Sequence, residues 1–353
     1  MVLQSSGAIS FANIQTEFGG ANPIGINEYY NDNASLYTKG ISGIPFTNNP
    51  ISLSQFYGKA KKNGLYTFST FTFTNAGASG RFGPTLSQIR SAYSATSWTQ
   101  DSTNNYINMT SQGIQEWKVP STGSYTINVG GAAGGNNGFT PGYGARMIGT
   151  FNLTEGMVLS ILVGQLGVVK SYSCNAGGGG GTFVWNKNSN SQPLIVAGGG
   201  GGGNRCGANP GLNAPTTINA TGGSGTSTTG TNGYGANPGG SGWFSNGING
   251  YYGANSGCTT PLGGGVGGAA LSYYSIGDGG FGGGAAASGV ACYNGGPGGG
   301  GGYSGGAGPS RDYTCPQAGG GGSYNTGTNQ NNTAGAITGN GYVVITANFT
   351  IYG

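Results

Sequence analysis

The sequence predicts an all-β protein, a β-sandwich into which a bundle of glycine-rich segments is inserted. Short apolar segments separated by turn residues are typical of a sandwich. Runs of four to six consecutive glycines, most of them with an apolar entry or exit, point to packed segments of extended backbone. Apolar segments also follow the last glycine run. The glycine-rich part is therefore one long insertion between strands of a β scaffold.

The glycines are unevenly distributed. Residues 1–119 hold 12 of the 81 glycines, and the remaining 234 residues hold 69. The longest run, at 198–203, follows the apolar segment 193–197, and three other runs lie at 177–181, 298–302 and 319–322. The composition therefore changes sharply near residue 120.

These runs favour a bundle of polyproline II helices. Such a helix has three residues per turn and no internal hydrogen bonds, so packed helices can pair N–H and C=O groups laterally, and only glycine fits where backbones touch. Because ordering glycine is costly, at about 1–2 kcal/mol per residue, many runs must pack together. The alternative is a set of flexible linkers. The glycines predicted for the core of the bundle are Gly177, Gly179, Gly200, Gly201, Gly300 and Gly320.

The charge and residue inventory excludes several functions. Charged residues make up 6 % of the chain and the net charge is +4, without a basic patch that could contact phosphates, so nucleic-acid binding is not expected. The chain has no histidine, which removes Ser-His-Asp and Cys-His catalysis and the commonest metal ligand. The carboxylates are scattered. We expect no enzyme activity, no metal and no cofactor.

Five cysteines, Cys174, Cys206, Cys258, Cys292 and Cys315, all follow residue 170. None forms a CxxC pair, which argues against zinc. They form either loop disulfides outside a cell, with one thiol left over, or buried free thiols. Residues 1–7 do not read as a secretory signal, and no apolar stretch reaches 18 residues, so no membrane span is expected.

Residues 1–57 form an N-terminal arm with a short internal repeat. Related segments at 9–14, 24–29 and 51–56 read as short helices, with Ser10 and Ser52 placed as N-caps. An arm of this size buries little surface, so we expect it to lie on another part of the protein or on a partner. Residues 58–64, which include three lysines, form a polar linker.

Residues 65–170 form the predicted β scaffold, which residues 341–353 close, and residues 171–340 form the glycine-rich part. Residues 85–93 predict one capped helix. The predicted strands begin with the aromatic segment 66–73 and continue at 114–119, 125–129, 147–153, 157–163, 183–185, 194–196, 342–346 and 349–351.

Two resemblances add to this interpretation. Ser-Gly-Ala-Ile-Ser-Phe at 6–11 and Pro-Ile-Ser-Leu-Ser-Gln-Phe-Tyr-Gly at 50–58 resemble segments in structural proteins of phages and large DNA viruses. Residues 65–353 resemble the glycine-rich domain of viral fibre proteins and of the anaplastic lymphoma kinase receptor family. The segments that carry this second resemblance are 80–84, 117–125, 130–135, 149–153, 162–167, 176–181, 194–203 and 339–345.

The second resemblance implies a jelly roll, similar to tumour-necrosis-factor domains, that carries a polyglycine II bundle. Such bundles also occur in phage tail-tip adhesins. Together, the two resemblances imply a virion-surface or tail-fibre protein in which residues 1–57 contact other virion proteins. The glycine-rich part would bind a glycan or protein on the host cell. The jelly roll alone also implies assembly as a homotrimer.

Aromatic side chains between the glycine runs are the candidates for receptor binding, since Tyr- and Trp-rich loops on a rigid base resemble a paratope. They are Tyr234, Trp243, Phe244, Tyr251, Tyr252, Tyr273, Tyr274, Tyr293, Tyr303 and Tyr313. The alternative is that these rings cover the bundle against water. A purely structural decoration or fibre subunit, and an ice- or surface-binding protein, remain as alternative functions.

Overall fold

The computed structural model describes most of the chain. The described residues are 3–20, 25–30, 43–45, 49–59, 64–136, 138–170, 175–204, 210–224, 228–236, 239–248, 254–270, 276–289, 295–308 and 316–351.

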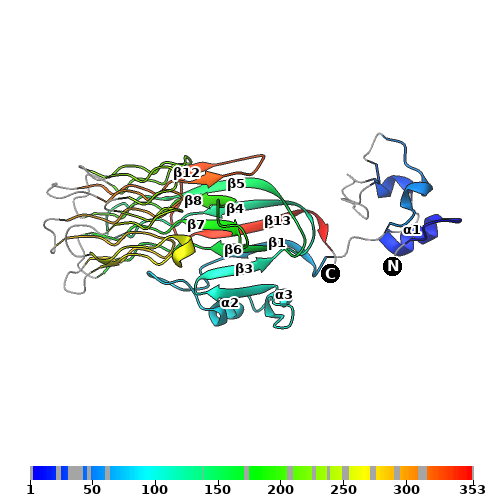
Figure 1. The fold of residues 1–353 in the computed structure, drawn as a ribbon, viewed down its shortest axis with the longest axis horizontal. Coiled ribbons are helices and arrows are strands. Elements are labelled where there is room, and N and C mark those ends of the chain that lie inside the picture. The colour runs from blue at the N-terminus through cyan, green and yellow to red at the C-terminus, as the bar shows by residue number, and fades with distance from the viewer. Residues whose placement is uncertain are drawn as a thin grey trace.

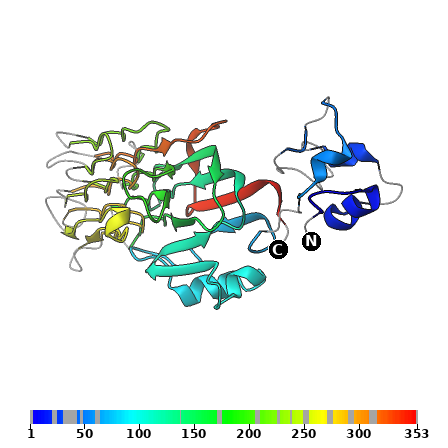
Figure 2. The ribbon, with the colours of Figure 1, turned by 45° about the vertical axis from the view of Figure 1, so that its right-hand side comes forward.

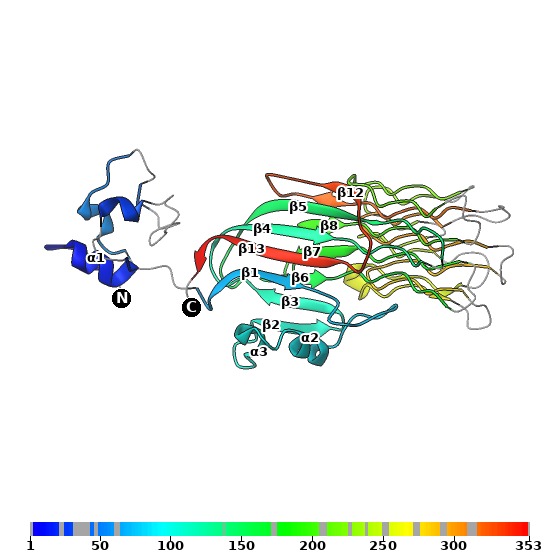
Figure 3. The same cartoon turned by 180° about the vertical axis from the view of Figure 1, so that it is seen from behind.

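Two antiparallel sheets form a sandwich, as predicted (Figure 1). The first has the order β1-β13-β4-β5-β12, made of β1 (Phe68–Phe73), β13 (Tyr342–Ile351), β4 (Gly123–Gly130), β5 (Gly144–Leu153) and β12 (Thr333–Ile337). The second has the order β11-β8-β7-β6-β3-β2, made of β11 (Tyr324–Asn325), β8 (Ile195–Ala197), β7 (Thr182–Asn186), β6 (Val158–Leu162), β3 (Ile114–Lys118) and β2 (Ile107–Ser111). Figure 3 shows β13 between β1 and β4.

The few helices are short. In the scaffold, α2 (Leu86–Ala92) is followed by α3 (Ser97–Gln100), close to β2 and β3 (Figure 2). Thr85 caps α2, because its hydroxyl accepts from the backbone N–H of Gln88 and the Gln88 side chain accepts from the backbone N–H of Thr85. The predicted helix at 85–93 is thus confirmed. The glycine-rich part adds η3 (Pro261–Gly263) and the strand pair β9 (Ala254–Ser256) and β10 (Ala269–Ala270). No described helix is long and apolar enough to cross a membrane.

The core between the sheets is aromatic. Trp117 of β3 and Tyr125 of β4 are fully buried with ring centroids 6.0 Å apart, and Phe73 of β1 lies 6.2 Å from Trp117. The strands alternate between this core and the opposite face, as a pleated strand does. On β3, for example, Trp117 enters the core between the sheets, whereas Ile114 belongs to a second cluster.

That second cluster covers the outer face of the second sheet. Five side chains lie opposite one another on successive strands and form an outer row of Ile114, Leu162, Phe183, Val196 and Tyr324. Trp243, Phe281 and Tyr303 of the glycine-rich part pack onto this row. Four strands of the sandwich, β7, β8, β11 and β12, come from residues 171–340. The predicted boundary at residue 170 therefore falls inside the sandwich.

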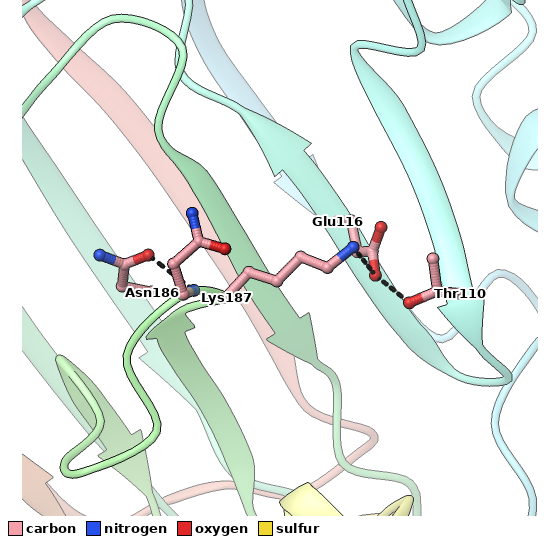
Figure 4. Close-up of polar contacts among 5 residues, drawn as sticks. Thr110, Glu116, Asn186 and Lys187 are labelled. Carbon is pink, nitrogen blue, oxygen red and sulfur yellow. Dashed lines mark hydrogen bonds and ion pairs between the residues drawn. The ribbon is translucent and has the colours of Figure 1, made fainter.

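A half-buried ion pair links β3 to the end of β7 (Figure 4). Glu116 of β3 is 5 % exposed, and its Oε1 lies 2.8 Å from Nζ of Lys187, which follows β7. The Thr110 hydroxyl donates to the same oxygen. A carboxylate this buried needs such partners. Glu116 therefore has a structural role in joining β2, β3 and the end of β7.

The glycine runs extend from one end of the sandwich and lie side by side (Figures 1 and 2). Their hydrogen bonds run laterally and repeat every three residues. Gly199 and Gly202 donate to residues 301 and 298 of one neighbouring segment, whereas Gly200 and Gly203 donate to residues 132 and 135 of another. The second run repeats this pattern, since Gly178 and Gly181 donate to residues 285 and 282. The backbone of each run thus turns toward a new neighbour at each residue.

The six glycines predicted for the bundle core are all buried. A Cβ added at any of them would meet backbone atoms of another segment. It would meet the carbonyl oxygen of Asp278 at Gly177, of Ala133 at Gly179, of Gly142 at Gly200, of Ala318 at Gly201 and of Gly199 at Gly300, and the amide nitrogen of Ala214 at Gly320. These contacts require glycine, because backbone cannot move aside as the end of a flexible side chain can.

The N-terminal arm has a small core of its own. It contains α1 (Phe11–Phe18) and the 3₁₀ turns η1 (Ile26–Tyr29) and η2 (Leu53–Phe56). Ser10 caps α1 by accepting from the backbone N–H of Asn13. Phe18, Tyr29 and Phe56 are fully buried against one another, with centroids 5.8–6.5 Å apart. The described arm thus buries more of its own surface than its size and irregular sequence predicted.

Candidate binding surface

Four of the ten predicted aromatic residues lie in the described part of the chain, and they fall into two groups. Tyr234 is 57 % exposed and Phe244 is 46 % exposed, whereas Trp243 is 1 % and Tyr303 is 5 % exposed. The other six, Tyr251, Tyr252, Tyr273, Tyr274, Tyr293 and Tyr313, lie outside the described residues.

Trp243 and Tyr303 are core residues, which corrects their assignment to an exposed surface. The Trp243 ring stacks on Phe183 at 6.3 Å and meets Trp185 edge-on at 5.7 Å, both on β7. Tyr303 stacks on Tyr324 of β11 at 4.4 Å. The outer face of the second sheet is apolar and must be covered, so these rings are used to attach the glycine-rich part to it.

Tyr234 and Phe244 form the exposed end of a continuous series of rings. Their centroids are 5.9 Å apart, Phe244 lies 6.4 Å from Tyr303, and Tyr303 stacks on Tyr324. The series therefore runs from the buried outer row to solvent. We call the pair Tyr234 and Phe244 the aromatic surface.

A tight turn sets the position of Tyr234. The Tyr234 N–H donates to the carbonyl of Thr231 at 3.0 Å, and φ is positive at both intervening residues, 52° at Asn232 and 89° at Gly233. This is the type I′ arrangement, for which Asn-Gly is the preferred pair. A Cβ at Gly233 would also lie 2.6 Å from the Phe244 ring. Glycine at 233 thus permits both the turn and the close approach of the ring.

Hydrogen bonds from neighbouring segments hold this backbone in place. Phe244 donates to the carbonyl of Gly233 at 2.8 Å, and Gly233 donates to the Ser304 hydroxyl at 2.9 Å. Gly305 donates to the carbonyl of Tyr234 at 3.0 Å. The two exposed rings are therefore carried by a fixed backbone, and little conformational entropy remains to be lost when they contact a partner.

Below the exposed rings, Tyr303 makes a polar contact that its sequence position did not predict. Its hydroxyl donates to Oε1 of Gln192 at 3.0 Å. Burial raises the pKa of Tyr303, so the phenol stays protonated and keeps donating at neutral pH. Sequence reasoning missed Gln192, because it lies in the polar β7–β8 connection, where no pattern singles out one side chain.

The side chains that commonly bind metal ions do not cluster in the described residues. Among them, no group of three or more His, Cys, Asp or Glu side chains lies close enough to hold a metal ion. Cys258 is a buried free thiol whose Sγ donates to the carbonyl of Gly239 at 3.4 Å, and burial raises its pKa to about 11. The other four cysteines lie outside the described residues.

Comparison with known proteins shows a partial similarity to a receptor. Over 114 residues, 30 % of this chain, the sequence is 37 % identical to the leukocyte tyrosine kinase receptor of Mus musculus. The matched part is 12 % of that receptor, so the chain corresponds to about an eighth of its length. No protein-family model matches the chain. The comparison thus shows a local similarity to part of this receptor, and it gives no support to the resemblance to viral proteins.

Proposed function

We propose that this protein is a host-attachment adhesin of a virion surface or tail fibre, which binds through side chains of its glycine-rich part. The aromatic surface carries this proposal. Tyr and aromatic neighbours on a rigid base give a large contact area at low entropic cost. The similarity to part of a receptor also agrees with a role in recognition. No catalytic chemistry is part of the proposal.

We further propose that the glycine runs form a polyglycine II bundle carried by a jelly roll. The three-residue repeat of the lateral hydrogen bonds supports this, because polyproline II has three residues per turn and leaves every N–H and C=O free to pair outward. The bundle would make the base of the aromatic surface stiff. The jelly roll, and with it a homotrimer, rest on the family resemblance.

The binding role predicts that Tyr234→Ala weakens attachment without loss of stability. Tyr234 is 57 % exposed, and truncating an anchoring aromatic residue commonly costs more than about 1–2 kcal/mol of binding, a fivefold to thirtyfold loss. The measurement is the binding of labelled protein to cells on which the virus grows, together with the melting temperature. Phe244→Ala should give the same direction of change.

Phe82→Ala is the matched control, since Phe82 is an aromatic residue of similar exposure, 54 %, in a different loop. Its binding should equal that of the native protein. If Tyr234→Ala and Phe244→Ala both bind normally and melt normally, the aromatic surface is not the contact. If the native protein binds no cells at all, the alternative of a purely structural fibre subunit without receptor binding is favoured.

We expect the N-terminal arm to be needed for joining virions but not for folding of the sandwich. Because its described core contains only residues of the arm, deleting residues 1–57 should leave the sandwich folded, with an unchanged melting temperature. The truncated protein should no longer join virions, since the arm is the proposed contact with other virion proteins. Co-sedimentation with purified particles measures this. An unfolded truncated protein, or one that still joins particles, would contradict the assignment.

A further inference from the structure

A pocket of about 520 Å³ opens where the chain passes from the sandwich into the glycine-rich part. Its lining comes from the β4–β5 connection, from residues 166–169 after β6, and from Thr338 between β12 and β13. The volume falls in the range of small-molecule sites. None of the aromatic-surface residues lines it, so the pocket is a separate site.

The floor of the pocket is glycine backbone held in place by lateral hydrogen bonds. Gly134 donates to the carbonyl of Gly142 at 3.0 Å, and Gly135 donates to that of Gly177 at 2.9 Å. A Cβ at Gly167 would meet the carbonyl oxygen of Gly177, so this floor cannot carry side chains. The backbone at these glycines is therefore fixed by neighbouring segments, which preforms this part of the lining.

The walls combine apolar and polar side chains. Phe139, Leu166 and Val169 form the apolar part, and the last two are 37 % and 39 % exposed. Asn136, Thr140, Tyr143 and Thr338 supply polar groups. Such a mixture of apolar surface and a few convergent polar groups is typical of ligand sites.

The backbones of these polar residues are anchored, and most of their side-chain polar groups have no partner within the described residues. The carbonyl of Thr140 accepts from Gly211, and Tyr143 is held by Asn213 Oδ1 at its N–H and by Ala214 at its carbonyl. Within the described residues, the hydroxyls of Thr140, Tyr143 and Thr338 have no hydrogen-bond partner. Asn136 uses its Oδ1 to accept from Gly138, which leaves its amide nitrogen to donate.

The lining carries no charged side chain. A phosphate, carboxylate or ammonium group would lose hydration there without gaining an ion pair, which disfavours charged ligands. A neutral ligand with several hydroxyls finds hydrogen-bonding partners among the polar residues of the lining, and the apolar residues of the lining suit its C–H face. We propose that this pocket binds one or two units of a neutral saccharide.

The test is a titration of the full chain with methyl glycosides of glucose, galactose, mannose and N-acetylglucosamine, followed by ligand-observed NMR. Glucuronate and glucosamine serve as charged comparators. At least one neutral glycoside should saturate with one site per chain, and the charged sugars should bind at least about tenfold more weakly.

Variants of the lining residues test whether the saccharide binds in the pocket. Tyr143→Phe removes only a hydroxyl and should weaken binding about threefold to tenfold, the loss expected for one hydrogen bond. Thr338→Val, in an exposed turn, provides a second variant with little risk to folding, and Phe139→Ala should weaken binding at least as much. Phe82→Ala, outside both the pocket and the aromatic surface, should bind as the native protein does.

Three results would overturn the proposal. They are no saturable binding by any neutral glycoside, affinities that Tyr143→Phe and Thr338→Val leave unchanged in folded protein, and charged sugars that bind as tightly as neutral ones. Because the aromatic surface lies elsewhere, loss of cell attachment in Tyr234→Ala with intact saccharide binding would separate the two sites.

Discussion

Replacing both Gly200 and Gly201 by alanine is expected to abolish folding. The added Cβ atoms would press on the carbonyl oxygens of Gly142 and Ala318, and neither backbone can move without breaking its own lateral hydrogen bonds. Overpacking costs about 1–3 kcal/mol per site, and each lost hydrogen bond costs about 0.5–1.5 kcal/mol more. A domain stable by only about 5–15 kcal/mol loses most of that. Circular dichroism, thermal melting and limited proteolysis measure the loss.

Gly339→Ala is the matched control. Gly339 has no atom within 4 Å of an added Cβ and no positive φ, so this variant should melt as the native protein does. If the Gly200/Gly201 double variant also melts normally, the run at 198–203 is a flexible linker and the proposed bundle is wrong.

Trp243→Ala should be the most damaging single truncation in the glycine-rich part. The ring is 1 % exposed and packs between the outer row and the glycine-rich part that covers it. Its removal is therefore expected to lower the free energy of unfolding by about 3–5 kcal/mol. Chemical denaturation with fluorescence detection gives this value. The neighbouring Phe244→Ala should cost much less, because Phe244 is 46 % exposed. Equal stabilities of the two variants would contradict the packing described.

Much of the scaffold follows from local sequence. Thr85 and Gln88 form the capping box that their spacing predicts, and the apolar segments at 147–153 and 157–163 correspond to β5 and β6. An added Cβ would have no room at the six glycines predicted for the bundle core. These features were predictable because each depends on a pattern of a few neighbouring residues.

Other features depend on contacts between distant residues. Strand β12, Thr-Ala-Gly-Ala-Ile, is small and partly exposed and pairs only with β5, so no alternation marks it. Trp243 and Phe244 are adjacent aromatics, yet one is buried and the other exposed, because segments 233–234 and 303–305 and strand β7 decide which ring faces the sheet. The pocket lined by Phe139 and Tyr143 was missed for the same reason, since three separate connections build it.

The position of β13 determines the order in which the sandwich can assemble. Strands β1 and β4, separated by about fifty residues, do not pair with each other, and each pairs with β13, some two hundred residues later in the chain. During synthesis, the first sheet therefore cannot close until almost the whole glycine-rich part has emerged. Folding dominated by such distant pairings is slow. Until β13 has been synthesised, β1 and one edge of β4 lack the strand with which they pair, so incomplete chains expose unpaired strand edges on which they can aggregate.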